Sequence, residues 1–332
     1  MIVSGNSHEV EQKMVSILKV LSESAEPVGS TTIARDLERH GISLSERAVR
    51  YHLKIMDERG YTQPVGRDGR MLTPLGIEEL KSALVPGQVG FMKDRLELLA
   101  FLTTFDPETK RGRVAINTTL FQKEVFREAL SAMQPAFKAG LCVSSLVGVA
   151  AGGERLGDVV IPPGKMGLAT VCSVTLNGVL LKAGIPMESR FGGVLALRNS
   201  RPKRFTSIIE YAGSSVDPSE AYIRARMTRV VDAARDGTGR ILANFREIPA
   251  PARALTQAII AKAEKAGISG ALLIGEASEP ICQIPVGLNR VGITLLGGLN
   301  PVAAAVESGI PVENVPESGT VDYQSLRSFW EL

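Results

Sequence analysis

An internal repeat constrains this chain of 332 residues more than any other feature. The matching pairs of segments are Arg113–Asn117 with Arg240–Asn244, Lys138–Gly140 with Lys265–Gly267, and Ala183–Pro186 with Ser308–Pro311. The first two pairs have the same offset of 127 positions, which is difficult to obtain by chance. A period this long is not that of a solenoid. We therefore expect one lobe, duplicated at about residues 111–200 and 238–323, whose two copies pack together.

Each copy has the pattern of an α/β lobe. A short strand precedes an amphipathic helix, and a pair of strands follows around a Pro-Gly segment. The runs 146–150 and 271–274 carry no polar side chain, which predicts strands buried on both faces or against helices. We expect a helix over 178–183, capped by Asn177 or Thr175, and a corresponding helix that begins near Asn300.

The segment 202–235 lies between the two copies and has no counterpart after Tyr323. Its pattern predicts a strand and then a helix that starts at Asp217-Pro218. A dimer contact and a flap over a binding site are both compatible with this segment, and the sequence does not decide between them.

The first copy is polar at its centre, where the second copy reads Thr-Leu-Leu-Gly at 294–297. Hydroxyls, a thiol and the free amides of a following helix start suit a carboxylate or a phosphate. We therefore expect a small-molecule site in the first copy and a scaffold role for the second, although Thr and Ser are also common in strands. The candidate site residues are Lys165, Thr170, Cys172, Ser173, Thr175, Asn177 and Arg190.

The first eighty residues predict three helices and a hairpin. Ser7 is the expected cap of the first helix, and Ser30 is that of the second. Ser43–Glu46 fits a capping box at the start of the third helix, which ends at Gly60. Two extended runs around the Asp68-Gly69 turn form a small wing, and a short helix capped by Thr73 follows. This order resembles the winged helix-turn-helix domain, which we assign to residues 1–80.

The third helix has a buried stripe at Val49, Leu53 and Met56 and a basic, aromatic face opposite. A helix fits the major groove of DNA, and arginines can pair with guanine or reach phosphates. We therefore expect DNA binding, with a solvated helix face or a protein contact as the alternatives. The candidate DNA-binding residues are Ser45, Arg47, Arg50, Tyr51, Lys54, Arg67 and Arg70.

Composition excludes several classes of protein. No apolar run reaches the ~18 to 20 residues of a membrane span, and no signal peptide is recognisable, so we expect a cytoplasmic protein without a membrane partner. The three cysteines are widely spaced, and all three histidines lie in the first 52 residues, which argues against a metal site in the large domain. The net charge of +3 is too small to indicate a partner.

Motifs of catalysis and nucleotide binding are absent from the sequence. Glycine pairs at 152–153, 192–193 and 297–298 lack the spacing of a dinucleotide fingerprint, and we interpret them as tight turns. No Walker sequence or Gly-x-Ser-x-Gly occurs, and no histidine follows position 52. We therefore expect no enzyme activity and no cofactor.

Several segments together resemble the NrpR regulatory domain. They are Gln88–Phe91, Thr104–Gly112, Pro162–Pro186, Glu188–Gly193 and Gly297–Pro301. With the winged helix in front, the chain resembles the NrpR family of transcriptional repressors, with an effector-binding domain at 81–332. The resemblance implies a homodimer that represses nitrogen-assimilation genes and leaves DNA when 2-oxoglutarate accumulates. Several members carry two regulatory domains and this chain carries one, so its assembly and effector stay open.

Two other functions remain as alternatives. The duplicated lobes could hold the substrate of an enzyme fused to a DNA-binding domain, with a small anion as the substrate. The large domain could also bind a protein and no metabolite. Under the repressor hypothesis, 2-oxoglutarate bridges the two lobes, with its carboxylates at Ser173, Thr175 and nearby amides. Closure of the lobes then changes the spacing of the two recognition helices in a dimer.

Overall fold

The computed structural model describes residues 5–24, 26–39, 42–66, 68–83 and 91–332. They form two compact units, one up to Val89 and one from Gly90 onward. Each unit has its own hydrophobic core, so each is described by itself.

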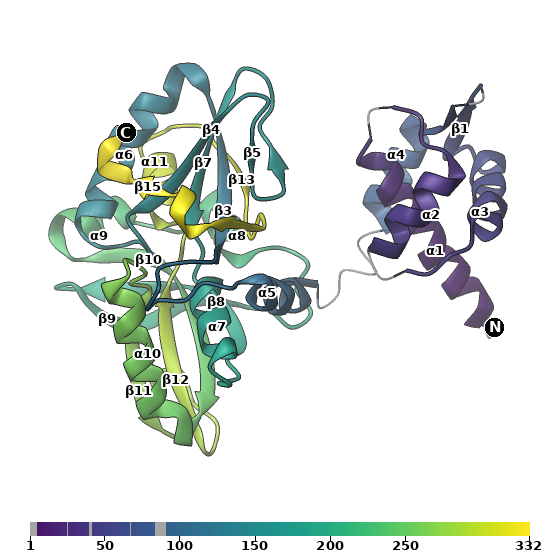
Figure 1. The fold of residues 1–332 in the computed structure, drawn as a ribbon. Coiled ribbons are helices and arrows are strands. Elements are labelled where there is room, and N and C mark those ends of the chain that lie inside the picture. Colours follow the sequence, from purple (N-terminus) through teal and green to yellow (C-terminus); the bar gives the residue numbers. More distant parts are fainter. Residues whose placement is uncertain (1–4, 25, 40–41, 67, 84–90) are drawn as a thin grey trace. The chain divides into compact units, whose positions relative to one another are not determined.

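The N-terminal unit has three helices, a hairpin and a fourth helix around one small core (Figure 1). The stripe of Val49, Leu53 and Met56 is fully buried, as the helical spacing predicts. Thr73 accepts a hydrogen bond from the Gly76 amide at 3.0 Å, which confirms the cap of the fourth helix. The elements are α1 (Gly5–Ser22), α2 (Ser30–Arg39), α3 (Glu46–Glu58), β1 (Thr62–Val65), β2 (Gly69–Leu72) and α4 (Pro74–Ala83).

Three predicted caps in this unit are wrong. Helix α1 begins at Gly5, so Ser7 lies inside it and does not cap it. Ser30 is the first residue of α2, and its hydroxyl donates to the Glu46 carboxylate at 3.0 Å instead of capping its own helix. The N-cap of α3 is Ser45, which accepts from the Ala48 amide at 3.2 Å, so Ser43 and Glu46 do not form a capping box. The side chain of Glu46 instead ties α3 to α2.

The C-terminal unit contains the two copies of the predicted repeat, each with the same order of elements. In the first copy these are β3 (Arg113–Gln122), α6 (Phe126–Lys138), β4 (Leu146–Ala151), β7 (Lys165–Val171), α7 (Val174–Lys182) and β8 (Glu188–Arg198). In the second copy they are β10 (Gly239–Pro249), α10 (Arg253–Lys265), β11 (Ala271–Ala277), β12 (Arg290–Leu296), α11 (Asn300–Glu307) and β13 (Glu313–Val315).

The copies exchange their last helix and strand. One sheet has the order β13-β3-β7-β4-β15, and the other has the order β11-β12-β10-β8-β9. Thus β8 of the first copy pairs with β10 of the second, and β13 of the second pairs with β3 of the first. The helices follow, since α11 packs on α6 and α7 packs on α10. The chain therefore crosses between the lobes after β7 and again after β12 (Figure 1).

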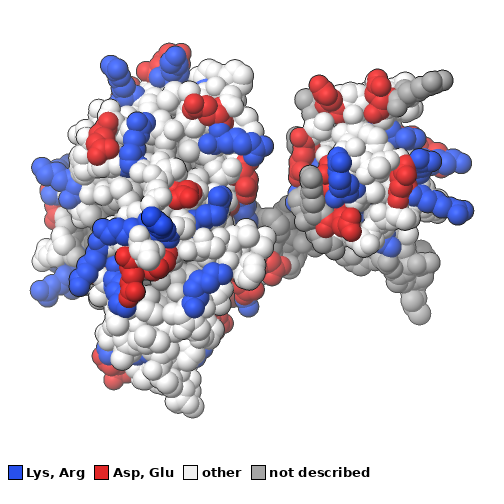
Figure 2. Space-filling model, in the orientation of Figure 1, with Lys and Arg blue, Asp and Glu red and all other residues white. Residues whose placement is uncertain are grey.

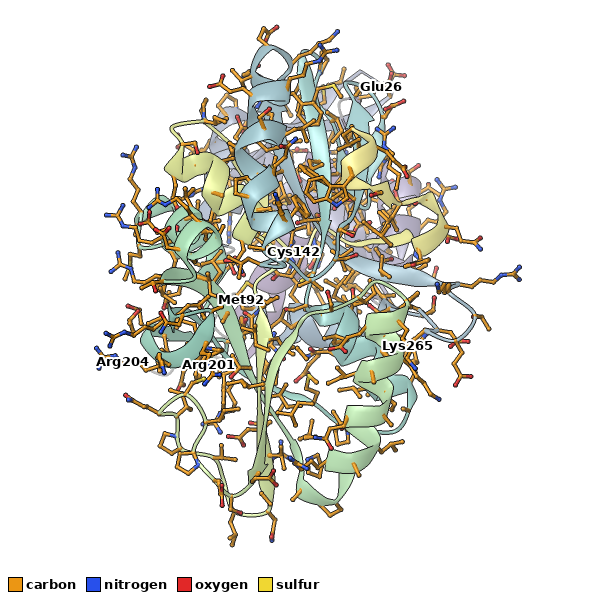
Figure 3. The ribbon with its side chains drawn as sticks, turned by 90° about the vertical axis from the view of Figure 1, so that its left-hand side faces the viewer. Glu26, Met92, Cys142, Arg201, Arg204 and Lys265 are labelled. Carbon is orange, nitrogen blue, oxygen red and sulfur yellow. The ribbon has the colours of Figure 1, made fainter. Side chains whose placement is uncertain are left out.

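The remaining elements complete the two lobes. Strand β9 lies at the edge of the second sheet and carries exposed Arg201 and Arg204 on its outer side (Figure 3). The remaining elements are α5 (Phe91–Leu102), β5 (Arg155–Leu156), β6 (Val159–Val160), β9 (Arg201–Glu210), α8 (Pro218–Arg224), α9 (Val230–Asp236), β14 (Thr320–Asp322), β15 (Arg327–Ser328), and 3-10 turns at Lys123–Val125, Ala250–Ala252, Tyr323–Ser325 and Phe329–Glu331.

Equivalent side chains fix the two exchanged helices. The Thr175 hydroxyl on α7 accepts a hydrogen bond from the amide of Ala115 at 3.1 Å and donates one to the carbonyl of Ala115 at 3.3 Å. At the matching place, the Asn300 amide on α11 accepts from the Leu242 amide at 2.7 Å and donates to its carbonyl at 2.9 Å. Each side chain satisfies both backbone groups of a buried strand residue. These bonds explain why Thr175 and Asn300 cap no helix.

Three further expectations are wrong. Helix α7 begins at Val174, so Thr175 and Asn177 lie inside it. Strand β11 is an edge strand with exposed positions, so 271–274 is not buried on both faces as its apolar run suggested. The glycines at 192–193 lie within strand β8 and form no tight turn, whereas those at 152–153 and 297–298 lie at turns, as expected. A Cβ on Gly298 would lie 2.6 Å from Asn117 Nδ2 and 2.7 Å from the Val171 carbonyl oxygen.

Within the part of the chain that the structure describes, no helix is both long and apolar enough to cross a membrane.

We predict that Asn300→Leu destabilises the C-terminal unit. The amide and carbonyl of Leu242 would lose their partners while still buried, which costs roughly 2–4 kcal/mol of unfolding free energy. Chemical denaturation of the full chain measures the loss. Gln257→Leu on the exposed side of α10 is the control and should change the free energy by less than about 0.5 kcal/mol. Equal stability of the two variants would contradict the role of Asn300.

Candidate functional site

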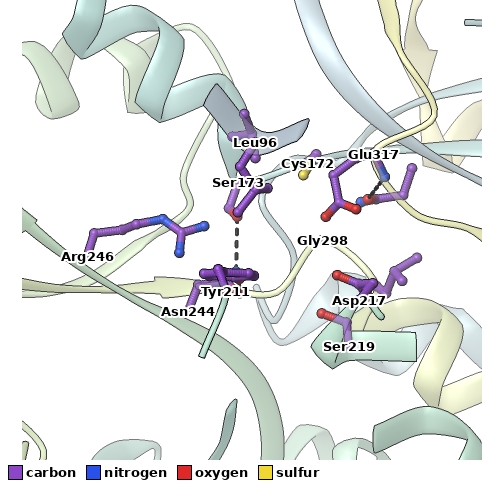
Figure 4. A pocket seen from close by; sticks show the side chains of 13 residues that line it. Leu96, Cys172, Ser173, Tyr211, Asp217, Ser219, Asn244, Arg246, Gly298 and Glu317 are labelled. Carbon is purple, nitrogen blue, oxygen red and sulfur yellow. Dashed lines mark hydrogen bonds between the residues drawn. The ribbon is translucent and has the colours of Figure 1, made fainter. Parts of the chain in front are cut away.

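A small polar cavity lies where the chain crosses between the lobes of the C-terminal unit (Figure 4). The first crossover contributes Cys172 and Ser173, and the second contributes Gly298 and Leu299. The equivalent strands β3 and β10 contribute Asn117 and Asn244, which the repeat places at matching positions. The cavity is therefore built from both copies, whereas the sequence analysis expected the site in the first copy alone.

Arg246 is the main charged group of this cavity. It follows Asn244 by two positions on β10, so both side chains point to the same face of the strand. The residue is only 1% exposed, and its guanidinium lies 4.8 Å from the centre of the Tyr211 ring. Among the described residues it forms no salt bridge, and its Nε has no hydrogen-bond partner. A buried cation without a counter-ion is costly, so this position favours an anionic ligand.

Hydroxyl and amide groups next to Arg246 form a connected chain. The Tyr211 hydroxyl donates to Asn244 Oδ1 at 2.6 Å, and Asn244 Nδ2 donates to the Ser173 hydroxyl at 3.0 Å. Figure 4 shows the Arg246 guanidinium pointing toward Ser173 and Tyr211. Burial raises the pKa of Tyr211 far above its ordinary value, so this hydroxyl keeps its proton. A carboxylate bound at Arg246 would thus meet neutral hydrogen-bonding groups.

Two carboxyl groups occupy the opposite side of the cavity (Figure 4). Asp217 precedes α8 and accepts from the Glu220 amide at 2.8 Å, while Glu317 lies in the loop between β13 and β14. Burial raises the pKa of Asp217 to about 6. Burial, followed by the nearby charge of Asp217, raises the pKa of Glu317 well above its ordinary value. Both groups therefore favour the protonated form more than exposed carboxyls do.

Helix α5 forms one wall of the cavity. Leu96 on this helix lines the space, and Arg95 donates to the carbonyls of Pro316 at 2.7 Å and Glu317 at 3.0 Å. The buried side of α5 packs in a cluster of its own with Cys172 and Tyr211, apart from the main core. The free volume of about 10 Å³ holds roughly one water molecule, so a larger ligand requires a wall to move.

The segment between the two copies is part of this site. Tyr211, Asp217 and Ser219 all line the cavity and all belong to residues 202–235. Of the two roles that the sequence left open, the structure supports the cover over a site. It does not test a dimer contact.

Only two of the predicted effector residues, Cys172 and Ser173, line the cavity. Thr170 is buried without a partner for its hydroxyl among the described residues, and the Asn177 side chain donates to Ser189 at 3.0 Å. Thr175 binds the Ala115 backbone.

Both predicted cationic residues have carboxylate partners elsewhere. Lys165 pairs with Glu313 at 2.5 Å, and Arg190 pairs with the buried Glu247 at 2.8 Å. Sequence patterns do not distinguish these two residues from Arg246, because ion pairs between distant strands leave no local pattern. The charge that Lys165 and Arg190 were expected to supply comes from Arg246 instead.

The sequence contains only a weak signal for the cavity-lining residues that the sequence analysis did not predict. Asn117 and Asn244 end the two matching segments of the repeat, so a polar pair at equivalent strand positions could have indicated the site. Asp217 and Glu317 come from loops outside the aligned segments, and nothing in their neighbourhood marks them.

The cysteines provide no reactive thiol or metal site. Burial raises the pKa of Cys172 to about 12 and that of Cys142 to about 12, so both stay as thiols. Within residues 5–83 and 91–332, as far as they are described, no group of three His, Cys, Asp or Glu could hold a metal ion.

The N-terminal unit presents a second candidate surface on α3. Arg47, Arg50, Tyr51 and Lys54 are all exposed on one face, with Tyr51 61% exposed. Figure 2 shows basic side chains gathered on this side of the unit. Arg50 pairs with Glu46 and also donates to Ser30 at 3.2 Å. Arg47 and Lys54 have no ion pair among the described residues, so they are available to phosphates.

The remaining predicted DNA-binding residues differ in position. Ser45 is exposed at the start of α3, where its hydroxyl accepts from Ala48. Arg70 is held by Asp57 at 2.8 Å, and its backbone pairs with Val28, so it anchors the wing instead of projecting from the tip. Arg67 lies outside the described residues.

We predict that the carboxyl pair makes stability depend on pH. Folded-state pKa values above the ordinary ones give stability that is complete below about pH 4 and is lost as the pH rises, through about 6 for Asp217. The raised pKa of Glu317 acts in the same direction. For Asp217 alone this corresponds to roughly 3 kcal/mol. The double variant Asp217→Asn/Glu317→Gln lacks this pH-dependent contribution to stability. The melting temperature of the variant relative to that of wild type should therefore increase from pH 4 to pH 7. A constant difference over this range would refute the prediction.

Comparison with known proteins gives matches over both units. A family model described as NrpR regulatory domains NRD1 and 2 matches residues 89–328. A second, described as the Ribonuclease R winged-helix domain, matches residues 15–80. The structure agrees with the second match, because α1 to β2 have the winged-helix order.

Relatives with similar sequences are named as nitrogen regulators. The global nitrogen regulator NrpRI of Methanosarcina mazei is 41% identical over 96% of this chain and 98% of its own length. NrpR of Methanocaldococcus jannaschii is 32% identical over 96% of this chain, and that of Methanococcus maripaludis is 31% identical over 94%. The chain spans about half the length of these two, 55% and 54%.

A solved structure supports the same relationship. The crystal structure of a nitrogen repressor-like protein from Methanococcus jannaschii matches with a TM-score of 0.59 and 27% identity, covering 71% of this chain and 97% of the other. With a family match across most of the C-terminal unit and a relative similar over its whole length, the chain belongs to the NrpR family.

Proposed function

We propose that this chain is a cytoplasmic transcriptional repressor that binds operator DNA through α3 and releases it when 2-oxoglutarate occupies the cavity between the lobes. Relatives named as global nitrogen regulators support nitrogen assimilation as the regulated process. The winged helix supports DNA as the partner. The family resemblance supplies the identity of the effector.

The observation that carries the effector proposal is Arg246. Its guanidinium is buried in an enclosed polar cavity and forms no ion pair among the described residues. Arginine binds carboxylates through two parallel hydrogen bonds, and such charged bonds are the strong ones. A carboxylate of 2-oxoglutarate would supply the missing counter-ion, with Ser173 and Asn244 beside it.

The position of the cavity suggests how binding alters the lobes. Both crossovers line it, so a ligand there touches the two segments that connect the lobes. The present cavity is too small for a dicarboxylate, and the ligand must therefore select a more open arrangement. A ligand shifts the equilibrium only by binding one arrangement more tightly than the other.

Helix α5 is the element through which this change would reach the DNA-binding unit. It covers the cavity with Leu96, and in the sequence it comes directly after the segment that joins the two units. Its separate packing cluster allows it to shift without rebuilding the main core. Displacement of α5 by the ligand would change the position of the N-terminal unit.

A homodimer completes the proposal. A single winged helix reads one half-site, and two recognition helices must lie about 34 Å apart, or a multiple of it, to meet successive major grooves. Effector-driven movement of α5 in each subunit would alter this spacing and so weaken binding to the operator.

We predict that Arg47→Ala combined with Lys54→Ala weakens operator binding about tenfold or more. Each phosphate contact that is lost should lower the slope of log affinity against log salt by about 0.9. Gel shifts with the chain's own upstream DNA at several salt concentrations measure both effects. Lys19→Ala on α1 is the control and should leave affinity unchanged. Wild-type affinity and slope in the double variant would show that this face does not bind DNA.

We predict that Arg246→Met lowers the affinity for 2-oxoglutarate by about 100-fold, because a charged hydrogen-bond pair contributes roughly 1.5–3 kcal/mol. Calorimetry measures the affinity, and operator release by 2-oxoglutarate should need correspondingly more ligand. Arg190→Met is the matched control, since Glu247 keeps Arg290 as a partner at 3.5 Å. The result that would contradict the proposal is a large loss in Arg190→Met with none in Arg246→Met.

A further inference from the structure

The carboxyl groups of Asp217 and Glu317 line the same cavity as Arg246 and lie close enough for the charge of one to affect the pKa of the other. Two ionised carboxylates repel each other and only accept hydrogen bonds, so burial in one cavity favours a state in which one of them carries a proton. Oε2 of Glu317 is buried and has no partner among the described residues. A polar atom is therefore directed into the cavity with its bonding capacity unused.

The backbone of Glu317 has an unfavourable conformation that orients its side chain. Its φ of 44° lies in the left-handed region, which is uncommon for residues other than glycine. Its amide donates to Asn117 Oδ1 at 3.1 Å, and its carbonyl accepts from Arg95 at 3.0 Å. Strained conformations of this kind persist where the surrounding structure holds them, and they concentrate at binding sites. The bonds from Asn117 and Arg95 hold the buried carboxyl in place.

The formal charges that line the cavity sum to about zero without a ligand, although among the described residues no carboxylate lies within ion-pair distance of Arg246. Arg246 carries one positive charge, and a carboxyl pair that shares one proton carries one negative charge. The other groups that face the pair are Arg95 from α5, Glu220 from α8, Cys172 at the end of β7 and Tyr211 after β9. Burial keeps the thiol and the phenol protonated, so neither can accept another proton.

A dianionic ligand would disturb this balance. Its first carboxylate pairs with Arg246, but its second would approach a pair that already carries negative charge. An uncompensated buried charge is expensive. A second proton on the pair would remove the repulsion and convert it into a donor for the ligand.

We propose that the Asp217–Glu317 pair takes up a proton from solvent when a dianionic effector binds, and that the neutral pair then donates a hydrogen bond to the effector. The proton comes from a hydronium ion or a buffer acid, whose O–H or N–H bond breaks as an O–H bond forms on a carboxylate oxygen of the pair. This inference rests on the proposed effector function. It also names the ligand class, because an amino acid of the same skeleton would present an ammonium group, which needs an ionised pair.

Calorimetry with 2-oxoglutarate and the full-length protein tests the proposal. Titrations at pH 7.5 in PIPES, HEPES and Tris separate the heat of binding from the heat of buffer ionisation, and so give the number of protons taken up. We expect about one proton for wild type, falling toward zero near pH 5, where the pair is already protonated. The dissociation constant should rise by up to about tenfold per pH unit above the pKa of the pair.

Variants assign the proton to the pair. The double variant Asp217→Asn/Glu317→Gln should bind with almost no proton uptake and with an affinity that does not change between pH 6 and pH 8. Either single variant should show reduced uptake, which provides a test if the double variant does not fold. Glu313→Gln, an exposed carboxyl paired with Lys165, is the control and should keep the wild-type uptake.

The outcomes separate this inference from the proposed function. Binding by wild type without proton uptake would overturn the inference and leave the effector proposal standing. Uptake that is unchanged in the double variant would also overturn it. Failure of wild type to bind 2-oxoglutarate would overturn both proposals.

Discussion

The cost of burying an unpaired positive charge is the constraint on which the rest of the C-terminal unit depends. Arg246 is almost fully buried, yet no carboxylate among the described residues pairs with it. Arg190 and Arg290 on the neighbouring strands share Glu247, so the same sheet also shows arginines that are satisfied internally. The difference supports our proposal that Arg246 binds an external anion, in which case the empty state is less stable.

Duplication of the lobe explains why the unpaired Arg246 lies at the crossovers between the two lobes. Exchange of a helix and a strand between the copies brings both crossovers to one point, where the equivalent strands β3 and β10 also meet. The two copies then diverged. The position equivalent to Arg246 is Thr119, which does not line the cavity and whose hydroxyl donates to Asn314 at 2.8 Å. The second copy therefore supplies the charge and the first copy supplies the crossover at Ser173, which reverses the expected division of roles.

Much of the fold could be predicted from the sequence, because local patterns determine it. The buried stripe of Val49, Leu53 and Met56, the turn around Asp68 and Gly69, and the repeat all follow from periodicity and backbone chemistry. The caps failed where a tertiary partner competed for the side chain. Glu46 binds Ser30 from another helix, and Thr175 binds a strand residue sixty positions away in sequence.

The candidate site was much less predictable. Cys172 and Ser173 were found because the polar centre of the first copy stands out from the second. Asp217 and Glu317 lie 100 positions apart and become neighbours only through the exchange between lobes. Lys165 and Arg190 looked equally suitable, since the sequence does not show which cations already have partners. Pairing between distant elements, and not residue type, decides which charge is available.

A crystal structure of the full-length protein with 2-oxoglutarate tests the central claim most directly. The account predicts one ligand carboxylate bound through two hydrogen bonds to Arg246, the other end at Asp217 and Glu317, and α5 displaced from its present position over Leu96. Ligand density at Lys165 or Arg190, with Arg246 still unpaired and the cavity closed, would contradict it.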